Sequence, residues 1–171
     1  MSAATTPAVA GIGLLAALGP KGILGGAHLD LVLQTSGVIV ALTFVSAPFY
    51  LRQAQSAFAA LDRSWLDASR TLGASEARTL ARVAIPAALP GISAGLALAW
   101  GRALGEFGAT LMFAGSFRGV TQTVPLAIYD RFATDFPSAL ALSAVLVCVS
   151  FALLLSVKLL ADRGALAVAP R

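Results

Sequence analysis

The side chains that could do chemistry in this 171-residue chain gather in one stretch, from Asp62 to Pro90 (DRSWLDASRTLGASEARTLARVAIPAALP). Acidic and basic residues are interspersed there, and a long apolar run lies on each side of the stretch. Farther along, Arg102 and Glu106 stand four residues apart, which lets the two side chains pair on one helix. Charged residues between apolar runs indicate the part of the chain that contacts water and, through it, a soluble partner.

Other reactive residue types stand alone. Cys148 is the single cysteine and lies in an apolar run, so we interpret it as a small buried hydrophobe and exclude an internal disulfide. His28, beside Asp30, is also alone, and we expect no functional role for it. The sequence contains no G-x4-G-K-[ST] nucleotide site. We therefore expect a chain that binds no cofactor or metal and is not an enzyme.

Composition favours a bilayer as the solvent of the remaining residues. The chain is 58% hydrophobic and 12% charged, with a mean hydropathy of +0.85. Soluble domains carry about 25% charged residues. The net charge of +4 would suit nucleic acid, but the low aromatic content and the position of the charges argue against that partner.

The apolar runs predict an all-α, polytopic membrane bundle that forms a single domain over residues 1–171. A full span needs about 20 residues. We expect about four membrane segments: a partial span over 3–18 and fuller spans over 31–51, 87–104 and 137–160. Arg52 is expected to close the second segment after a kink at Pro48, and Pro137 is expected to begin the last.

Basic residues predict the orientation of these spans. An excess of positive charge marks the cytoplasmic side. The segment between 52 and 82 and the tail after 157 are both basic, and two spans separate them. Residues 105–136, with the apolar pieces ATLMFAG and VPLAIY, then form an outer loop. Glycines spaced four apart in the third span predict close helix packing or, alternatively, a pore lining: Gly91, Gly95, Gly101 and Gly105.

Local signals in residues 62–86 predict two helices joined at a glycine. Ser64 and Asp67 fit a capping box that would begin a helix over Trp65–Leu72. An apolar stripe runs along it (Leu61, Trp65, Ala68 and Leu72), and Gly73 follows where a positive φ is needed. Ser75 is expected to cap a second helix, over Glu76 to about Ala84, with Pro86 and Pro90 leading into the next span. Physics alone allows two roles, an interfacial helix on anionic headgroups or a docking element for a soluble partner.

The same stretch resembles the EAA loop of ABC-importer permeases, whose pattern is E-A-A-x3-G-x9-I-x-L-P. Asp67-Ala68-Ser69 stands for E-A-A, Gly73 is the glycine, and Val83-Ala84-Ile85-Pro86 stands for I-x-L-P, with every spacing kept. The string from Gly101 to Asp130 (GRALGEFGATLMFAGSFRGVTQTVPLAIYD) looks like the molybdate branch of these permeases. Sulfate permeases are similar through RALGEFGA. The resemblance covers the chain from about Pro7 to Leu160.

The resemblance implies a permease of the type I ABC-importer kind in the bacterial inner membrane. It implies a homodimer, two cytoplasmic ATPase subunits that hold ATP and Mg, and a periplasmic or lipid-anchored molybdate-binding protein. In this family the segment matching 62–86 is a cytoplasmic coupling helix seated in a cleft of the ATPase. The positions that carry this role over are Asp67, Ala68, Ser69, Leu72, Gly73, Val83, Ile85 and Pro86.

Under the same resemblance, passage of an oxyanion needs weak, exchangeable donors. The candidates are Thr110, Ser116, Arg118, Thr121, Gln122 and Thr123. Arg118 is equally well interpreted as a contact for the binding protein. Arg102 and Glu106, near the outer end of a span, are expected to form a structural or gating ion pair, because ionisable groups there are costly unless paired.

We therefore expect ATP-driven import of molybdate. The alternatives are transport of sulfate or tungstate, a non-conducting membrane subunit that docks the ATPase, and a secondary transporter that needs no ATPase. Family members usually carry one or two further spans before the region matching Thr5-Thr6-Pro7, so we expect a shortened permease or a misassigned start.

Overall fold

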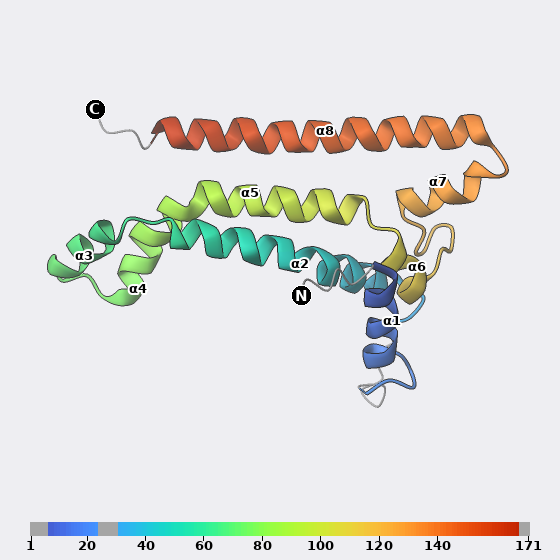
Figure 1. Ribbon diagram of the computed structural model, residues 1–171, viewed down its shortest axis with the longest axis horizontal. Helices are drawn as coiled ribbons and strands as arrows, with labels where there is room; N and C mark the ends of the chain where they lie inside the picture. The colour runs from blue at the N-terminus through green and yellow to red at the C-terminus, as the bar shows by residue number, and fades with distance from the viewer. Residues whose placement is uncertain (1–6, 24–30, 168–171) are drawn as a thin grey trace. The chain divides into compact units, whose positions relative to one another are not determined.

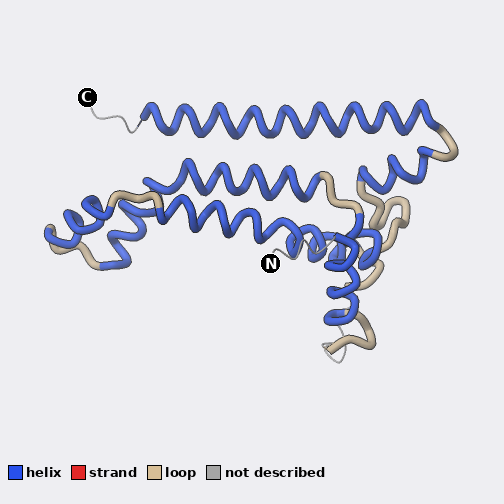
Figure 2. The backbone as a smooth tube through the Cα atoms, in the orientation of Figure 1, coloured by secondary structure: helices blue, strands red, loops and turns tan. Residues whose placement is uncertain are grey.

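A computed structural model describes residues 7–23 and 31–167 of the chain. All regular structure in these ranges is helical (Figure 2), which confirms the all-α prediction. In chain order the elements are α1 (Pro7–Leu18), α2 (Thr35–Ala59), α3 (Arg63–Thr71), α4 (Glu76–Thr79), the π-helical turn η2 (Leu80–Ala84), α5 (Ile85–Leu104), α6 (Gly108–Ala114), α7 (Val124–Phe132) and α8 (Phe136–Ala167) (Figure 1).

Three helices in the described part of the chain are long and apolar enough to cross a membrane. They are α2, the continuous helical run Glu76–Leu104, and Phe136–Val157 within α8. The apolar helix α1 is shorter, at 12 residues. The three long helices correspond to the predicted full spans, and α1 corresponds to the partial span. Residues 3–6 of the partial span lie outside the described residues, and so does His28.

The helix α2 differs from its predicted span at both ends. It begins at Thr35, because Leu33 has a positive φ of 61° that a helix does not allow. It continues to Ala59, so the prediction that Arg52 closes it is wrong. The residues after Arg52 are mostly Gln and Ala, which are good helix formers and extend the helix beyond its apolar part. Pro48 lies inside the helix, as expected.

The predicted outer loop, residues 105–136, contains two short helices. The apolar pieces ATLMFAG and VPLAIY lie largely on α6 and α7. Gly115, with a φ of 72°, ends α6, and Pro125 lies in the first turn of α7, where its missing N–H costs nothing. The two predicted apolar pieces of this stretch are thus helical, and its position outside the membrane stays a prediction.

The helix α8 begins where Pro137 was expected to place it and extends beyond the predicted end at 160, to Ala167. Its first turn is capped by Asp135, whose carboxylate accepts hydrogen bonds from the hydroxyl and the backbone N–H of Ser138. These hydrogen bonds lower the pKa of Asp135. Cys148 is exposed on α8, so its interpretation as a buried side chain is wrong for the chain by itself.

Contacts divide the chain into two compact units, residues 1–47 with 100–151 and residues 48–99 with 152–171. In the first, α1 packs across α6 (Figure 1). The buried core there consists of Leu14 from α1, Ala41 from α2, and Ala109 and Phe113 from α6. The backbones approach closely at Gly11, where an added Cβ would lie 2.8 Å from both the Cα and the carbonyl oxygen of Ala109.

In the second unit, the last turns of α2 pack against α5. A Cβ at Gly91 would collide with that of Ala57, and one at Gly95 would lie 3.0 Å from the Cβ of Gln53. These contacts confirm the packing interpretation for Gly91 and Gly95. Small residues at i and i+4 let the two helix backbones approach.

Between α4 and α5 the helix widens into η2. Pro86 has no N–H to donate, and in an α-helix its ring would crowd the carbonyl four residues earlier, that of Arg82. In η2 the N–H of Ile85 bonds instead to the carbonyl of Leu80, five residues back. The second predicted helix, over Glu76 to Ala84, is thus helical throughout but ends in a π turn.

The close approach at Gly11 predicts that a glycine-to-alanine substitution changes the stability of the chain differently at Gly11 and at Gly13, both on α1. Gly11→Ala should destabilise the chain by about 1–3 kcal/mol, because the new methyl group overlaps the backbone of α6. Gly13→Ala is the matched control, since no described heavy atom lies within 4 Å of the Cβ position at Gly13. It should be neutral or stabilise by up to about 1 kcal/mol. Thermal unfolding in detergent measures both, and equal effects would contradict the α1–α6 contact.

Candidate functional site

The N-cap residue of α3 is Asp62, not Ser64. The Asp62 carboxylate accepts the backbone N–H of Ser64 at 2.9 Å, and this hydrogen bond lowers the pKa of Asp62. The predicted capping box is therefore wrong. Asp and Ser are comparable N-caps, and Asp67, which the box requires to reach back toward Ser64, is instead paired with Arg70.

The turn between α3 and α4 has the predicted glycine. Gly73 has a φ of 78°, and its N–H bonds to the carbonyl of Arg70 at 2.9 Å. The N–H of Ala74 bonds to the carbonyl of Ser69, so the last carbonyl groups of α3 are satisfied by the turn. Ser75 occupies the N-cap position of α4, as predicted, but its side chain forms no capping hydrogen bond.

Two side-chain contacts join α3 to α4 across this turn. Arg70 makes a bidentate contact with Glu76, from Nε to Oε1 at 2.9 Å and from Nη2 to Oε2 at 3.2 Å. Its Nη1 also donates to Asp67 Oδ1 at 3.1 Å. The hydrogen bond with Glu76 is the main cause that raises the pKa of Arg70. The hydroxyl groups of Ser69 and Thr79 lie 2.9 Å apart, and Thr79 is buried.

Sequence reasoning did not identify Arg70, Glu76 or Thr79. The available signal was a pair of opposite charges, at 70 and 76, on either side of a glycine that reverses the chain. That spacing does not produce a contact within a single helix, where neighbours are three or four residues apart. It does so only once the turn folds α4 back toward α3.

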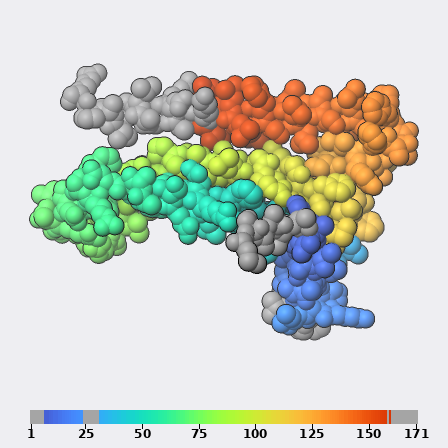
Figure 3. Space-filling view, viewed as in Figure 1, coloured from blue at the N-terminus to red at the C-terminus, as the bar shows by residue number. Residues whose placement is uncertain are grey.

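The apolar stripe of α3 is uncovered in this chain. Trp65 is 51% exposed and Leu72 is 86% exposed. Figure 3 shows the α3–α4 hairpin, in green, at the surface beyond the ends of α2 and α5. Large apolar side chains so exposed on a strongly amphipathic helix are typical of an interaction surface.

The sequence-predicted coupling residues all fall in the second unit. Asp67, Ala68 and Ser69 lie on α3, and Leu72 and Gly73 form its end. Val83 lies in η2, while Ile85 and Pro86 begin α5. The structure thus gathers these residues into one hairpin and the helix that leaves it.

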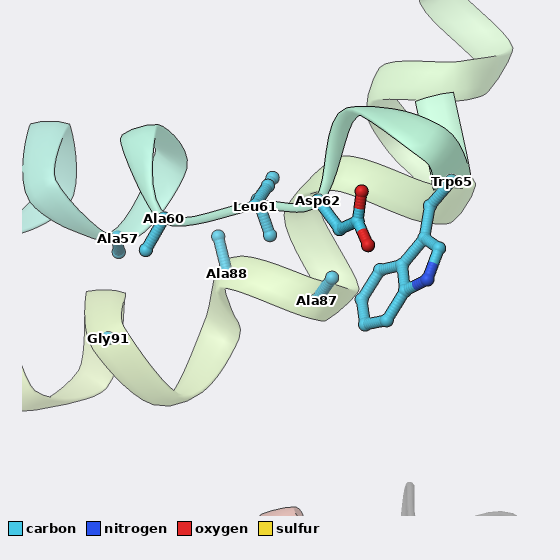
Figure 4. A pocket seen from close by; sticks show the side chains of 8 residues that line it. All are labelled: Ala57, Ala60, Leu61, Asp62, Trp65, Ala87, Ala88 and Gly91. Carbon is cyan, nitrogen blue, oxygen red and sulfur yellow. The ribbon is translucent and has the colours of Figure 1, made fainter. Parts of the chain in front are cut away.

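A hollow lies behind the hairpin, between the end of α2 and the beginning of α5 (Figure 4). Its volume is about 350 Å³, and small residues line most of it: Ala57, Ala60, Ala87, Ala88 and Gly91. Leu61, the Asp62 carboxylate and the Trp65 indole complete the wall. Because these wall residues are small, α3 has open space behind it at this end of the spans.

Arg102 and Glu106 form an ion pair at the far end of α5, with Nη1 and Oε2 2.7 Å apart. The angle does not suit a hydrogen bond, so Oε2 has no donor among the described residues and the contact is coulombic. The Glu106 side chain is fully buried, whereas that of Arg102 is 27% exposed. Oε1 of Glu106 accepts the N–H of Ala109 at 2.7 Å, so the carboxylate joins the last turn of α5 to the first of α6.

The substrate-pathway candidates lie in α6 and in the loop that leads to α7. The hydroxyl of Thr110 donates to the carbonyl of Phe107, and that of Thr121 accepts the N–H of Phe117. Gln122 lies 3.5 Å from Ser116, at the limit of a hydrogen bond. Two candidate hydroxyl groups, Thr110 on α6 and Thr121 in the loop, are therefore held in backbone contacts.

Two other candidates differ in how they are partnered. Arg118 pairs with Asp130 of α7 at 3.1 Å, with both side chains exposed. The hydroxyl oxygen of Thr123 is buried and has no hydrogen-bond partner among the described residues. A further residue that sequence reasoning missed is Thr35, whose hydroxyl donates to the Val120 carbonyl at 2.9 Å and ties the loop to α2.

The sequence that forms these apolar spans and the amphipathic hairpin matches a known family. Residues 3–164 match the family described as binding-protein-dependent transport system inner membrane component, and the chain belongs to that family. The family consists of transport components, and its members are not enzymes.

Several curated relatives make the similarity more specific. The chain is 42% identical over 155 residues to the molybdenum transport system permease protein ModB of Mycobacterium tuberculosis. It is 40% identical over 157 residues to the probable transport system permease protein NifC of Clostridium pasteurianum, and 34% identical over 161 residues to the sulfate transport system permease protein CysT of Escherichia coli. The alignments cover 88%, 90% and 91% of this chain but only 59%, 55% and 58% of the three relatives.

The two ion pairs of the first unit predict a contrast in stability. Glu106→Gln should cost about 3 kcal/mol, because it removes one charge of a pair whose carboxylate is wholly buried. Asp130→Asn makes the same change in the exposed pair with Arg118 and should cost less than about 1 kcal/mol. Thermal unfolding in detergent measures both. Similar losses for the two variants would show that burial does not set the importance of the Arg102–Glu106 pair.

Proposed function

We propose that this chain is the membrane-spanning permease subunit of an ATP-driven importer of molybdate. The observation that carries the proposal is the hairpin of α3 and α4, which keeps the spacing of an EAA loop and leaves the apolar side chains of Trp65 and Leu72 uncovered. In the proposal, the ATPase is the partner that covers this surface. In the proposal, ATP and Mg bind that partner and this chain holds no cofactor.

The proposed mechanism begins on the cytoplasmic side of the bacterial inner membrane. ATP binding closes two ATPase subunits, and the α3 helices of two permease copies move with them. The pair changes from inward-open to outward-open, and a periplasmic or lipid-anchored binding protein delivers the anion to the outer mouth. The basic residues between α2 and α5 support this orientation, since positive charge marks the cytoplasmic side.

At the outer mouth, the proposal gives the loop between α6 and α7 the role of an oxyanion path. The buried hydroxyl of Thr123, which has no hydrogen-bond partner among the described residues, supports it, because such a donor can bond an anion that reaches it and then release the anion. Arg118, exposed beside Asp130, suits a contact with either the anion or the binding protein. The Arg102–Glu106 pair is assigned a structural or gating role, because its carboxylate already accepts the Ala109 N–H and is paired by charge with the Arg102 guanidinium.

Molybdate is preferred as substrate because the more similar relatives include molybdenum transport permeases at 42% identity, against 34% for the sulfate permease. Sulfate is the second candidate, and that relative is the observation that favours it. Tungstate has almost the same size and charge as molybdate and stays in the same class. A non-conducting subunit that only docks the ATPase is the remaining alternative.

Reversing the charge of Asp67 tests the coupling assignment. Asp67→Lys should abolish ATPase binding and ATP-dependent uptake, because it places a cation on α3 beside Arg70 and removes the acidic group of the motif. Asp67→Glu is the matched control and should retain both, since it restores the longer acid of the family pattern. Co-purification with the ATPase and uptake into vesicles are the measurements. Full coupled uptake by the Lys variant would refute the coupling role of α3.

Competition between anions tests the substrate. In vesicles with the ATPase and the binding protein, labelled molybdate uptake should require ATP, and unlabelled molybdate and tungstate should suppress it more strongly than sulfate does. Stronger suppression by sulfate would favour the second candidate. ATPase binding without uptake of any of the three anions would favour the docking subunit, and uptake without an ATPase would favour a secondary transporter.

A further inference from the structure

We propose that Arg70, together with the Ser69–Thr79 hydroxyl pair, is a positioning device that locks α3 to α4 so that movement of α3 reaches α5. This inference rests on the proposed coupling function of the hairpin. Ser69 is the last residue of the E-A-A match, whereas Arg70, Glu76 and Thr79 lie outside the motif positions E-A-A, G and I-x-L-P. These residues act through the angle between the two helices and are not assigned a contact with the ATPase.

The turn at Gly73 is the place where movement would otherwise be lost. Gly73 has a φ of 78°, and no described heavy atom lies within 4 Å of the position that a Cβ would take. Glycine has wide backbone freedom, so an uncrowded glycine between two short helices is a natural hinge. A docked α3 could bend at this hinge and leave α4 where it was.

The two contacts across the turn oppose such bending. The planar Arg70 guanidinium meets both oxygens of Glu76, at 2.9 and 3.2 Å, while Nη1 holds Asp67 on its own helix. A bidentate contact fixes direction as well as distance. The Ser69–Thr79 hydrogen bond adds a second point of attachment, at 2.9 Å, and its Thr79 side is buried. Two attachments on either side of one turn leave the hinge little freedom.

Beyond α4 the connection to α5 is continuous. The run Glu76–Leu104 is helical without a break, and α3 packs against both α4 and η2. The hollow lined by Ala57, Ala60 and Ala88 provides room behind α3 (Figure 4). While the Arg70–Glu76 and Ser69–Thr79 contacts are formed, α3, α4 and η2 move toward or away from this hollow as one rigid body. Because η2 continues into α5, α5 moves with them.

The test uses Arg70→Gln in the permease reconstituted with its ATPase and binding protein. The ratio of molybdate imported to ATP hydrolysed should fall, by roughly threefold as expected for loss of an exposed ion pair, while the ATPase still co-purifies. Arg78→Gln is the matched control, since it removes the same charge from α4 and Arg78 makes no ion pair within the described residues. An unchanged ratio in Arg70→Gln would overturn the proposal.

A disulfide distinguishes positioning by Arg70 from a direct contact with the ATPase. In a Cys148→Ala background, Ser69→Cys with Thr79→Cys replaces the hydroxyl pair by two thiols. Oxidation should restore the import ratio of Arg70→Gln, and reduction should remove the rescue. A crosslink that forms without rescue would show that Arg70 acts by touching the partner, and a pair that does not oxidise would contradict the hydroxyl contact itself.

A measurement on the permease alone separates this inference from the proposed function. Spin labels at Ser64→Cys and Ala77→Cys, two exposed positions on α3 and α4, report the distance between the helices in the Cys148→Ala background. Arg70→Gln should broaden that distance distribution, and an unchanged width would overturn the lock. If the width broadens but no ATPase binds the hairpin of the unaltered chain, the proposed function fails and the lock stands.

Discussion

Backbone hydrogen bonding in lipid is the constraint on which this structure depends. A bilayer offers no partner to an N–H or a C=O, so each span must satisfy its own backbone. Prolines inside a span interrupt this pattern, because a proline has no N–H to donate. Pro48 lies in α2, and Pro86 and Pro90 lie in the first turns of α5. Before Pro86 the helix widens into η2, where the N–H of Ile85 bonds to the carbonyl of Leu80.

The same constraint explains why the ionisable side chains concentrate at the two ends of α5. Charges inside a span are costly unless paired. Before α5, the hairpin keeps its charges exposed and paired across a turn, through Arg70 and Glu76. At its far end, the buried Glu106 carboxylate accepts the N–H of Ala109 through Oε1, and its Oε2 lies 2.7 Å from Nη1 of Arg102 in an ion pair. The charged side chains before α5 are thus exposed, and the carboxylate after α5 is buried in the fold.

Features governed by one residue were predictable from the sequence. The positive φ of Gly73 followed from its place after an amphipathic stretch, and the start of α8 followed from Pro137. The apolar runs located the spans, but they could not give the polar ends of α2 and α8, which extend on helix propensity beyond the hydrophobic part. Family spacing predicted a set of coupling residues, which the structure places on the α3–α4 hairpin, in η2 and at the start of α5. Their coupling role stays a prediction.

Features that depend on competition or on tertiary contact were not predictable. Asp62 and Ser64 are both good caps, so the local sequence does not decide between them; in the structure Asp62 caps α3 and Asp67 pairs with Arg70. The helices α6 and α7 are too short to be stable alone, and α6 owes its place to packing against α1. The partner of Arg118, Asp130, is twelve residues away and is brought near only by the loop between α6 and α7.

The π turn gives the fixed spacing of the motif a geometric meaning. Each residue of an α-helix rotates the chain by about 100° around the helix axis. Because η2 bonds five residues back, its turn contains one residue more than an α-helical turn, and the residues after it face a direction that a regular helix would not give them. The nine-residue interval between Gly73 and Val83 therefore sets a rotational phase between the hairpin and α5. A chain that lost one residue in this interval could keep every side chain of the α3–α4 hairpin, but the apolar stripe of α3 would face a different direction relative to α5.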